Sequence, residues 1–247
     1  MAAESITVVH SDTEVTPYDM ATLGSRSLFH MGNAVKLAAE DALQKLNSLR
    51  KELSLAADSA VAEIFKKKYG MQAGNVVGTG SYIPSYKSPD ANGLTDNATP
   101  FWMVGGTGAD VEVDTETGRV RVTRLVNVAD VGTPINPKIV ETQLSGAAIM
   151  QLGFTLQEKM EFDAQGQLRN ASFAEYKIPG ILDLPQAMVN EAVVAEQKTG
   201  PFGGKGVGDT GTFGVSPAIA NAIHDAVGVR LTSLPLSAEA IFMALRK

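Results

Sequence analysis

The sequence predicts an α+β fold of mixed hairpins and helices, and three observations lead to that prediction. Hydrophobic residues make up 44% of the 247 and charged residues 19%, as in folded soluble domains. Apolar residues recur at helical spacing in several segments, and alternating apolar residues flank a glycine-containing turn. The elements do not alternate regularly between strand and helix, so a doubly wound parallel sheet is not expected.

The first part of the chain predicts a short strand over 5–10 and two helices. The longer helix is expected over 33–53, from apolar residues at helical spacing: Val35, Ala38, Ala39, Ala42, Leu46, Leu49 and Leu53. The shorter helix, over 56–69, should end at Gly70, since glycine commonly follows the last helical residue. Residues 71–107 are rich in Gly, Pro and small polar residues and predict a long loop with at most one strand.

The middle of the chain predicts a β-hairpin, a helix and a second hairpin. Strands over 110–114 and 119–128 flank the turn that ends at Gly118. A helix should start near Pro137, because proline suits the first helical turn. Its expected apolar side comprises Ile139, Val140, Leu144, Ala147 and Met150. The second hairpin is expected around residues 165–167.

The last part predicts two helices separated by a strand. Ser216 and Pro217 indicate a helix start, with Ser216 as the cap, and Gly228 indicates its end. Residues 229–234 predict a strand, and a final helix should begin at Ser237.

Composition excludes several kinds of function. The net charge is −6, which argues against general attraction to nucleic acid or to an acidic membrane. The chain has no cysteine, so cysteine-ligated iron–sulfur clusters cannot lie on it. Its three histidines are far apart, and no metal ligands from the protein are expected. No apolar run approaches the roughly 20 residues that span a bilayer, and no signal peptide is visible, so we expect a cytoplasmic protein.

The first candidate motif is the segment 21–27, just before the long helix. Thr22, Gly24, Ser25, Arg26 and Ser27 concentrate hydroxyls, backbone N–H groups and a guanidinium at a loop-to-helix junction. Helix N-termini bind anions, and arginine can add a bidentate phosphate contact. The alternative is simple N-capping by Ser25 or Ser27, and composition leaves both interpretations open.

The second candidate motif is the glycine-rich segment 200–214. Six glycines between 203 and 214 allow close approach of the backbone to a ligand, and Asp209 lies among them. A carboxylate on such a loop is a candidate general base. The P-loop consensus is absent. A flexible exposed loop with an ordinary aspartate is the alternative, and the residues alone do not decide between the two.

The two motifs occur within an ordered series that resembles the xanthine dehydrogenase and aldehyde oxidase family, in the C-terminal half of its molybdenum-binding region. The series covers nearly the whole chain: Val8 to Asp19, Gly24 to Ser27 with Gly32 to Val35, Val111 to Gly118, Asp130 to Pro137, Gln143 with Gly146, Tyr176 to Pro179, Asp183 to Pro185, Gly204 to Asp209, and Pro217 to Asp225. No single piece is specific, but the ordered set is.

The resemblance implies a molybdopterin-binding subunit of a molybdenum hydroxylase, with residues 1–247 as one domain. Two subdomains would separate near 70–107 and rejoin through 108–247. Asp209 would be the general base, and Gly206 and Gly208 would let the loop approach the metal. The residues implied to contact the pterin or its phosphate are Thr22, Gly24, Ser25, Arg26 and Ser27. The implied substrate is an aldehyde, a purine or an N-heteroaromatic.

The resemblance also implies cofactors and partners. Molybdopterin would be present as the cytosine dinucleotide with molybdenum. Iron–sulfur clusters and FAD would lie on partner subunits, together with a subunit that carries the other half of the molybdenum-binding region. A half domain leaves apolar surface and sheet edges exposed, which also predicts a partner chain.

The chain departs from the family pattern at the base. The family has glutamate where this chain has Asp209, whose side chain is one methylene shorter. Either the loop lies closer to the metal, or a water bridges the gap, or the site is impaired or tuned to another substrate. The rival functions are a non-catalytic molybdopterin-binding scaffold, a phosphate-binding module unrelated to molybdenum, and a purely structural domain.

Overall fold

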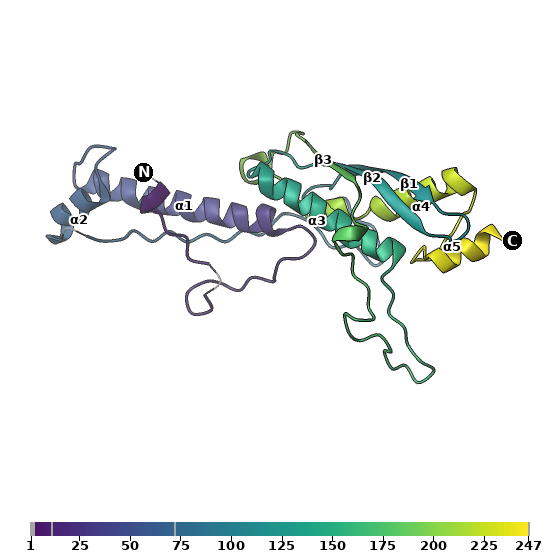
Figure 1. Ribbon diagram of the computed structural model, residues 1–247. Coiled ribbons are helices and arrows are strands. Elements are labelled where there is room, and N and C mark those ends of the chain that lie inside the picture. Colours follow the sequence, from purple (N-terminus) through teal and green to yellow (C-terminus); the bar gives the residue numbers. More distant parts are fainter. Residues whose placement is uncertain (1–2, 11, 72, 247) are drawn as a thin grey trace. The chain divides into compact units, whose positions relative to one another are not determined.

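The computed structural model describes residues 3–10, 12–71 and 73–246, and the chain forms two compact units (Figure 1). Unit 1 consists of Met1–Pro100 with Thr199–Pro201, and unit 2 of Phe101–Lys198 with Phe202–Lys247. Each unit is described by itself below.

Unit 1 contains the two predicted helices. Helix α1 spans Ser27–Glu52, six residues longer at its start than predicted, and α2 spans Val61–Tyr69. Gly70 ends α2 as predicted, in a left-handed conformation with φ of 67°. The strand predicted over 5–10 is wrong. The short 3-10 helix η1, Ala3–Ser5, lies there instead, and no strand of the described part of unit 1 offers the pairing that a strand needs.

An extended segment after α2 packs its backbone directly on α1. A side chain at Gly78 would come within 2.0 Å of the Ala38 carbonyl oxygen, and one at Gly80 within 2.2 Å of the Ala34 carbonyl oxygen. Polar contacts fix the register: the Thr79 N–H donates to Asp41 Oδ2 (2.8 Å), and Lys45 Nζ donates to the Val77 carbonyl (2.9 Å). The predicted long loop therefore holds no strand before residue 105 among its described residues, yet it is tied closely to the helix.

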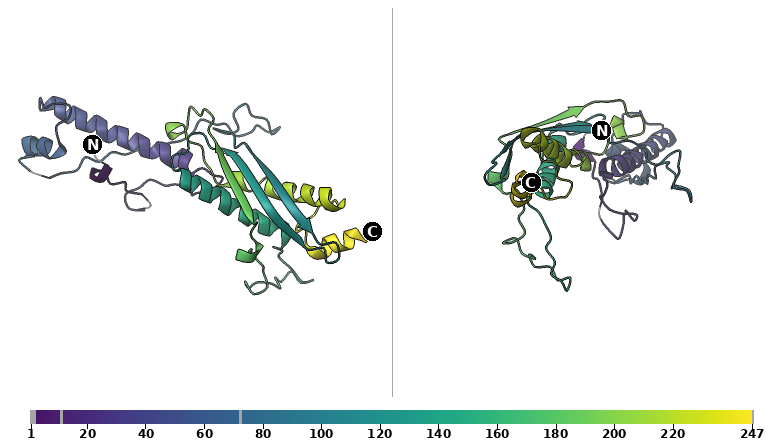
Figure 2. Two further views of the ribbon diagram at one scale, coloured as in Figure 1. Left: turned by 45° about the horizontal axis from the view of Figure 1, so that its top comes forward. Right: turned by 90° about the vertical axis from the view of Figure 1, so that its right-hand side faces the viewer.

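Unit 2 is built on a three-stranded sheet in the order β1-β2-β3 (Figure 2). Strands β1 (Gly105–Val113) and β2 (Val120–Asp130) form the predicted antiparallel hairpin. Gly118 closes its turn with φ of 73° and donates to the Asp114 carbonyl. Strand β3 (Ala187–Val193) pairs in parallel with β2 and was not predicted from the sequence.

Helices α3 (Pro137–Leu156) and α4 (Val215–Val227) pack on the sheet, and α5 (Ala238–Leu245) follows (Figures 1 and 2). Asn136 caps α3 and Ser237 caps α5 with their side chains. Gly228 ends α4 as predicted. The main core lies between the sheet and the helices and comprises Val122, Leu125, Ala148, Leu152, Val215, Ile219, Ile223, Leu236 and Ile241. Unit 2 thus has a hydrophobic core of its own, and the α+β fold is confirmed.

Three local predictions in unit 2 need correction. On α3, Leu144 and Ala147 of the predicted apolar side are buried, but Ile139 and Met150 are exposed, because the buried face continues through Ala148 and Leu152. Ser216 does not cap α4: its hydroxyl accepts from Gln151 Nε2 and bonds Thr155 Oγ1, inside the structure. Residues 229–234 form no strand, since they pair with no strand of the sheet. The hairpin predicted around 165–167 is present in short form, with one antiparallel bridge between Phe162 and Leu168 and a hydrogen bond from the Asp163 N–H to the Gln167 carbonyl.

Candidate active site

The glycine-rich loop of unit 2 is held against the segment that follows β2. The Thr133 N–H donates to the Gly203 carbonyl (2.7 Å), and the Lys205 N–H donates to the Val131 carbonyl (3.0 Å). Between these bonds, Gly132 and Gly204 face each other in an antiparallel bridge. A side chain at Gly132 would lie 2.3 Å from the Gly203 carbonyl oxygen, so glycine is required for this close approach. The first half of the loop is therefore fixed rather than flexible.

A buried ion pair lies directly beside this ladder. Lys205 is only 8% exposed, and its Nζ donates to Asp130 Oδ2 at 2.6 Å and to the Trp102 carbonyl at 3.3 Å. Asp130, the last residue of β2, accepts from the Gly132 N–H through its other oxygen. Burial raises the pKa of Asp130, but the hydrogen bonds from Lys205 and from the Gly132 and Ala195 N–H groups outweigh it and hold this pKa below its ordinary value. The carboxylate is thus ionised at neutral pH.

Asp209 lies at the exposed end of the same loop. It opens the short 3-10 helix η4, Asp209–Gly211, and its carbonyl accepts from the N–H and hydroxyl of Thr212. Thr210 and Gly211, which follow Asp209, are buried. Gly211 lies so close to α3 that a side chain there would come within 2.8 Å of Ala147 Cβ. Gly206 is buried and Gly208 half-buried. The loop therefore presents one exposed carboxylate from a backbone that is anchored on both sides.

Among the described residues of unit 2, three buried side-chain atoms in β2, β3 and η4 have no hydrogen-bond partner in the protein. They are Asn127 Nδ2, Asn190 Oδ1 and Thr210 Oγ1. Asn127 of β2 and Asn190 of β3 are paired across the two strands. The hydroxyl of Thr107, in β1, donates to Asn127 Oδ1 at 2.8 Å. Polar side chains thus cross the sheet, and Thr210 directly follows Asp209 in η4.

The other predicted site residues lie at the start of α1, in unit 1. Gly24 and Ser25 both have left-handed backbones, with φ of 57° and 60°. Ser27 is the first helical residue, and its hydroxyl donates to Thr22 Oγ1 at 2.7 Å. The N-cap residue is Arg26, which gives no side-chain cap, and the first turn contains no acidic residue. Simple N-capping by Ser25 or Ser27, the alternative left open by the sequence, is therefore wrong.

Arg26 turns its guanidinium back onto its own loop. Nη1 donates to the Ala21 carbonyl at 2.8 Å and contacts Asp19 Oδ1 at 3.3 Å. Its main contacts therefore order the loop 19–26 in front of the helix.

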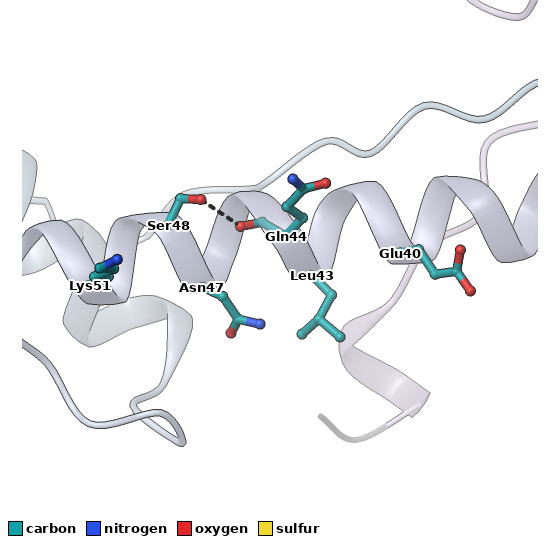
Figure 3. A pocket seen from close by; sticks show the side chains of 6 residues that line it. All are labelled: Glu40, Leu43, Gln44, Asn47, Ser48 and Lys51. Carbon is teal, nitrogen blue, oxygen red and sulfur yellow. Dashed lines mark hydrogen bonds between the residues drawn. The ribbon is translucent and has the colours of Figure 1, made fainter.

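A shallow hollow on α1 lies far from these residues (Figure 3). Its lining comes from one helix: Glu40, Leu43, Gln44, Asn47, Ser48 and Lys51. At 1.5 Å per residue, Glu40 lies about 20 Å along the helix from Ser27. The hollow is an open helix face, and none of the predicted site residues contributes to it.

Sequence reasoning missed the partner of Lys205. Asp130 and Lys205 are separated by 75 residues, and neither spacing nor periodicity links them. The available signal was indirect: Lys205 lies between two glycines of the glycine-rich loop, and Asp130 ends an apolar strand two residues before Gly132. None of the helices in the described ranges combines the length and the apolar character that a membrane span needs. Within the same ranges, no three or more acidic, histidine or cysteine side chains are grouped closely enough to hold a metal ion.

Comparison with known proteins identifies the family. Residues 1–185 match the family model described as a molybdopterin cofactor-binding domain. A "Probable hypoxanthine oxidase" of Escherichia coli is 32% identical over 99% of this chain and 26% of its own length. The "6-hydroxypseudooxynicotine dehydrogenase complex subunit gamma" of Paenarthrobacter nicotinovorans is 31% identical over 98% of this chain and 32% of its own length. The chain thus spans about a quarter to a third of the relatives that it matches.

Solved structures agree. The aldehyde oxidoreductase from Desulfovibrio desulfuricans superposes with a TM-score of 0.77 and 28% identity, over 90% of this chain and 23% of that one. Quinoline 2-oxidoreductase from Pseudomonas putida gives a TM-score of 0.73 and 25% identity, over 95% of this chain and 32% of that one. The family match covers three quarters of the sequence, and the resemblance seen in the ordered motifs is confirmed. The chain belongs to the molybdopterin cofactor-binding domains of the xanthine dehydrogenase and aldehyde oxidase family.

Proposed function

We propose that this chain forms part of the active site of a molybdenum hydroxylase, in which Asp209 is the general base. The reaction would oxidise an electron-poor carbon of an aldehyde, purine or N-heteroaromatic, with water as the oxygen source. The observation that carries the proposal is the anchored glycine loop, which ends in an exposed carboxylate. The relatives named as hypoxanthine oxidase and as a dehydrogenase subunit support the reaction class.

The bound molybdenum cofactor would supply the redox centre that takes up the two electrons of the oxidation. The role of this chain is to place a proton acceptor beside that centre. The Asp209 carboxylate would accept the proton that the oxygen nucleophile loses, which contributes about 10²- to 10⁴-fold in typical general-base catalysis. Gly206 and Gly208 have no side chains that would keep the loop away from a bound group. Asp209 has the same functional group as the usual glutamate, so the anchoring of the loop must set its reach.

The start of α1 fits an anionic part of the cofactor. A helix of 26 residues carries a positive dipole end there, and its first turn has neither an acidic residue nor a side-chain cap, while Asp19 contacts the guanidinium of the N-cap residue Arg26. Thr22, Gly24, Ser25 and Ser27 would contact the pterin or its phosphate through hydroxyl and N–H groups. Arg26 would add its positive charge to the same junction while it orders the loop through Ala21 and Asp19.

The finer assignment of cofactor and partners is also part of the proposal. We assign the cytosine dinucleotide form of molybdopterin, and residues 1–247 as one cofactor-binding domain with subdomains that separate near 70–107. These 247 residues contain no cysteine, so the iron–sulfur clusters that carry electrons away would lie outside them. We assign the clusters and FAD to partner subunits.

A partner chain carrying the other half of the molybdenum-binding region would cover unit 1. Met31, Val35, Ala39 and Leu43 follow one another at four-residue spacing along α1 and are all exposed. An exposed apolar stripe of this kind marks an interaction surface. Replacing Val35 and Leu43 by glutamate should weaken assembly with the partner at least tenfold. Co-purification of the tagged chain with its partner measures this, and unchanged recovery would contradict the assignment.

Elemental analysis tests the reaction class. The native complex should contain molybdenum in stoichiometric amount, and oxidation should release a fluorescent pterin. A complex with neither would be a different phosphate-binding module. A complex with both, whose turnover is indifferent to Asp209, would be a scaffold rather than a catalyst.

A further inference from the structure

The pair Lys205–Asp130 is more deeply placed than the other ion pairs of the described chain. Its side chains are 10% and 16% exposed, whereas Arg121 and Glu112, a pair on the β1-β2 hairpin of the same unit, are 53% and 67% exposed. A buried charge that loses its partner is costly, because water cannot reach it freely. The segment that carries Lys205 must therefore stay where Asp130 holds it, or move to hydrate the charge.

The backbone around Lys205 needs such a restraint. Phe202 and Gly203 both have left-handed backbones, with φ of 52° and 82°. For phenylalanine this conformation is sterically unfavourable, because its Cβ crowds the backbone, and such strain persists only where the surroundings enforce it. Three restraints on this segment are the hydrogen bonds that join Lys205 to Val131 and Gly203 to Thr133, and the ion pair of Lys205 with Asp130.

Asp209 lies four residues beyond Lys205, between two anchors. On one side is the lysine with its carboxylate. On the other, buried Thr210 and Gly211 lie against the sheet and α3, and Val207 packs on the cluster of Ala129, Val131 and Leu144. Because Lys205 and Asp209 are close in sequence on the same loop, a shift of the Lys205 backbone would also displace the Asp209 carboxylate. Catalysis is sensitive to such shifts, since a misplacement of about 1 Å can lower a rate about 100-fold.

We propose that the buried pair Lys205–Asp130 is a positioning device that sets the reach of the Asp209 carboxylate. Neither residue touches the reacting atoms. Together they hold the strained start of the glycine loop in the geometry from which the shorter aspartate can act as the base. This inference rests on the proposed function of Asp209.

The test uses the assembled complex, with four variants of this chain. Lys205→Met and Asp130→Asn each remove one charge, and the double variant removes both. Arg121→Met is the matched control, because it breaks an exposed pair on the same sheet. Turnover, KM, molybdenum content and hydrogen exchange of residues 203–211 are measured for each.

Each single variant should lower kcat by about 10- to 100-fold at unchanged molybdenum content. KM should change little, and exchange should speed up in 203–211 before the rest of unit 2. The double variant separates positioning from stability. It leaves no unpaired charge, so its resistance to unfolding should recover, but the tether is still missing and kcat should stay low. Arg121→Met should alter neither kcat nor the resistance of the chain to unfolding.

Two further comparisons decide whether the effect passes through Asp209. Adding Lys205→Met to Asp209→Ala should cause no further loss of turnover, because the positioned group is already gone. Lys205→Arg keeps the charge and should restore part of the lost rate. The proposal is overturned if Lys205→Met leaves kcat and local exchange unchanged, if exchange rises equally throughout unit 2, or if the two losses multiply.

These outcomes separate the inference from the proposed function. If Asp209→Ala is fully active, the proposed base is wrong, while local exchange still reports whether the pair holds the loop. If Asp209→Ala is inactive but the Lys205 and Asp130 variants behave like Arg121→Met, only the positioning role is wrong.

Discussion

Units 1 and 2 are stabilised in different ways. Of the buried hydrophobic residues described, unit 1 contributes three, namely Phe29, Leu46 and Ile64, whereas unit 2 contributes fourteen and builds two clusters from them. Unit 1 relies instead on backbone contacts. Gly78 and Gly80 lie on α1, and buried Arg50 binds the Ser59 carbonyl with two of its nitrogens (3.1 and 2.7 Å).

The difference explains where chemistry can be placed. A carboxylate that must be held precisely needs a packed support, and Asp209 has one in the sheet, α3 and the ion pair of unit 2. Unit 1 leaves much of its apolar surface exposed, including Ile6, Val9, Tyr18 and Met31. It therefore suits binding to a cofactor or partner that supplies the missing contacts.

The largest effect is expected in the core of unit 2. Ile219 is fully buried between α4 and the sheet, and Ile219→Ala should cost about 2–5 kcal/mol of the free energy of unfolding. Leu37→Ala on α1 is the control, because Leu37 is 39% exposed, and it should cost under about 1 kcal/mol. Urea unfolding of the full protein measures both. Equal losses would show that the burial of Ile219 does not stabilise the core of unit 2.

The ion pair should make unit 2 sensitive to acid. The pKa of Asp130 is lowered in the folded protein, so its contribution is present above the ordinary value of 3.8 and is lost as pH falls through the lower folded value. Asp130→Asn should cost about 1–3 kcal/mol at pH 7, because it leaves buried Lys205 without its charge partner while Asp130 itself is only partly buried. The gap between variant and parent should shrink below about pH 4. A pH series of urea unfolding curves tests this, and a constant gap would contradict it.

Unit 1 should respond to a single methyl group at its backbone contact. Gly78→Ala places a carbon against the Ala38 carbonyl oxygen, and overpacking of this kind costs about 1–3 kcal/mol. Hydrogen exchange along α1 should accelerate, whereas Val77→Ala, at an exposed neighbouring residue, should leave it unchanged. Identical exchange in both variants would show that the segment is not held on the helix.

The smallest expected effect is a gain in the stability of unit 2. Gly146 lies inside α3 and faces open space, so Gly146→Ala should stabilise unit 2 by about 0.5–1 kcal/mol through helix propensity. Gly153→Ala in the same helix should destabilise instead, because its side chain would lie 2.7 Å from Pro179 Cδ. Thermal unfolding distinguishes the two signs.

Local signals in the sequence predicted the elements that depend on neighbouring residues. Gly118 in the hairpin turn and Gly70 and Gly228 as helix ends act within a few residues, and the structure confirms all three. The helix start predicted at Ser237 is confirmed to within one residue, since Ser237 caps α5. Strands were less predictable, because a strand exists only where another edge accepts its hydrogen bonds. Residues 229–234 have strand-like composition but no partner strand, while β3 has one in β2.

In the candidate site, too, the features set by neighbouring residues could be predicted, and those set by distant residues could not. The glycine loop and Asp209 could be found from composition and motif order, and the α1 junction from hydroxyls before a helix. The pairing of Lys205 with Asp130 could not, since it depends on the course of the chain over 75 residues. The unpaired Thr210 hydroxyl and the Asn127 and Asn190 side chains likewise emerge only once the sheet is assembled.

The most direct measurement is turnover of the native complex with Asp209 replaced, at verified molybdenum content. Asp209→Ala should lower kcat by about 10²- to 10⁴-fold, because the proton acceptor is removed while the cofactor contacts remain. Asp209→Glu keeps the carboxylate and should stay far more active than Asp209→Ala. An unaltered rate in Asp209→Ala, with molybdenum fully retained, would contradict the assignment of Asp209 as the base.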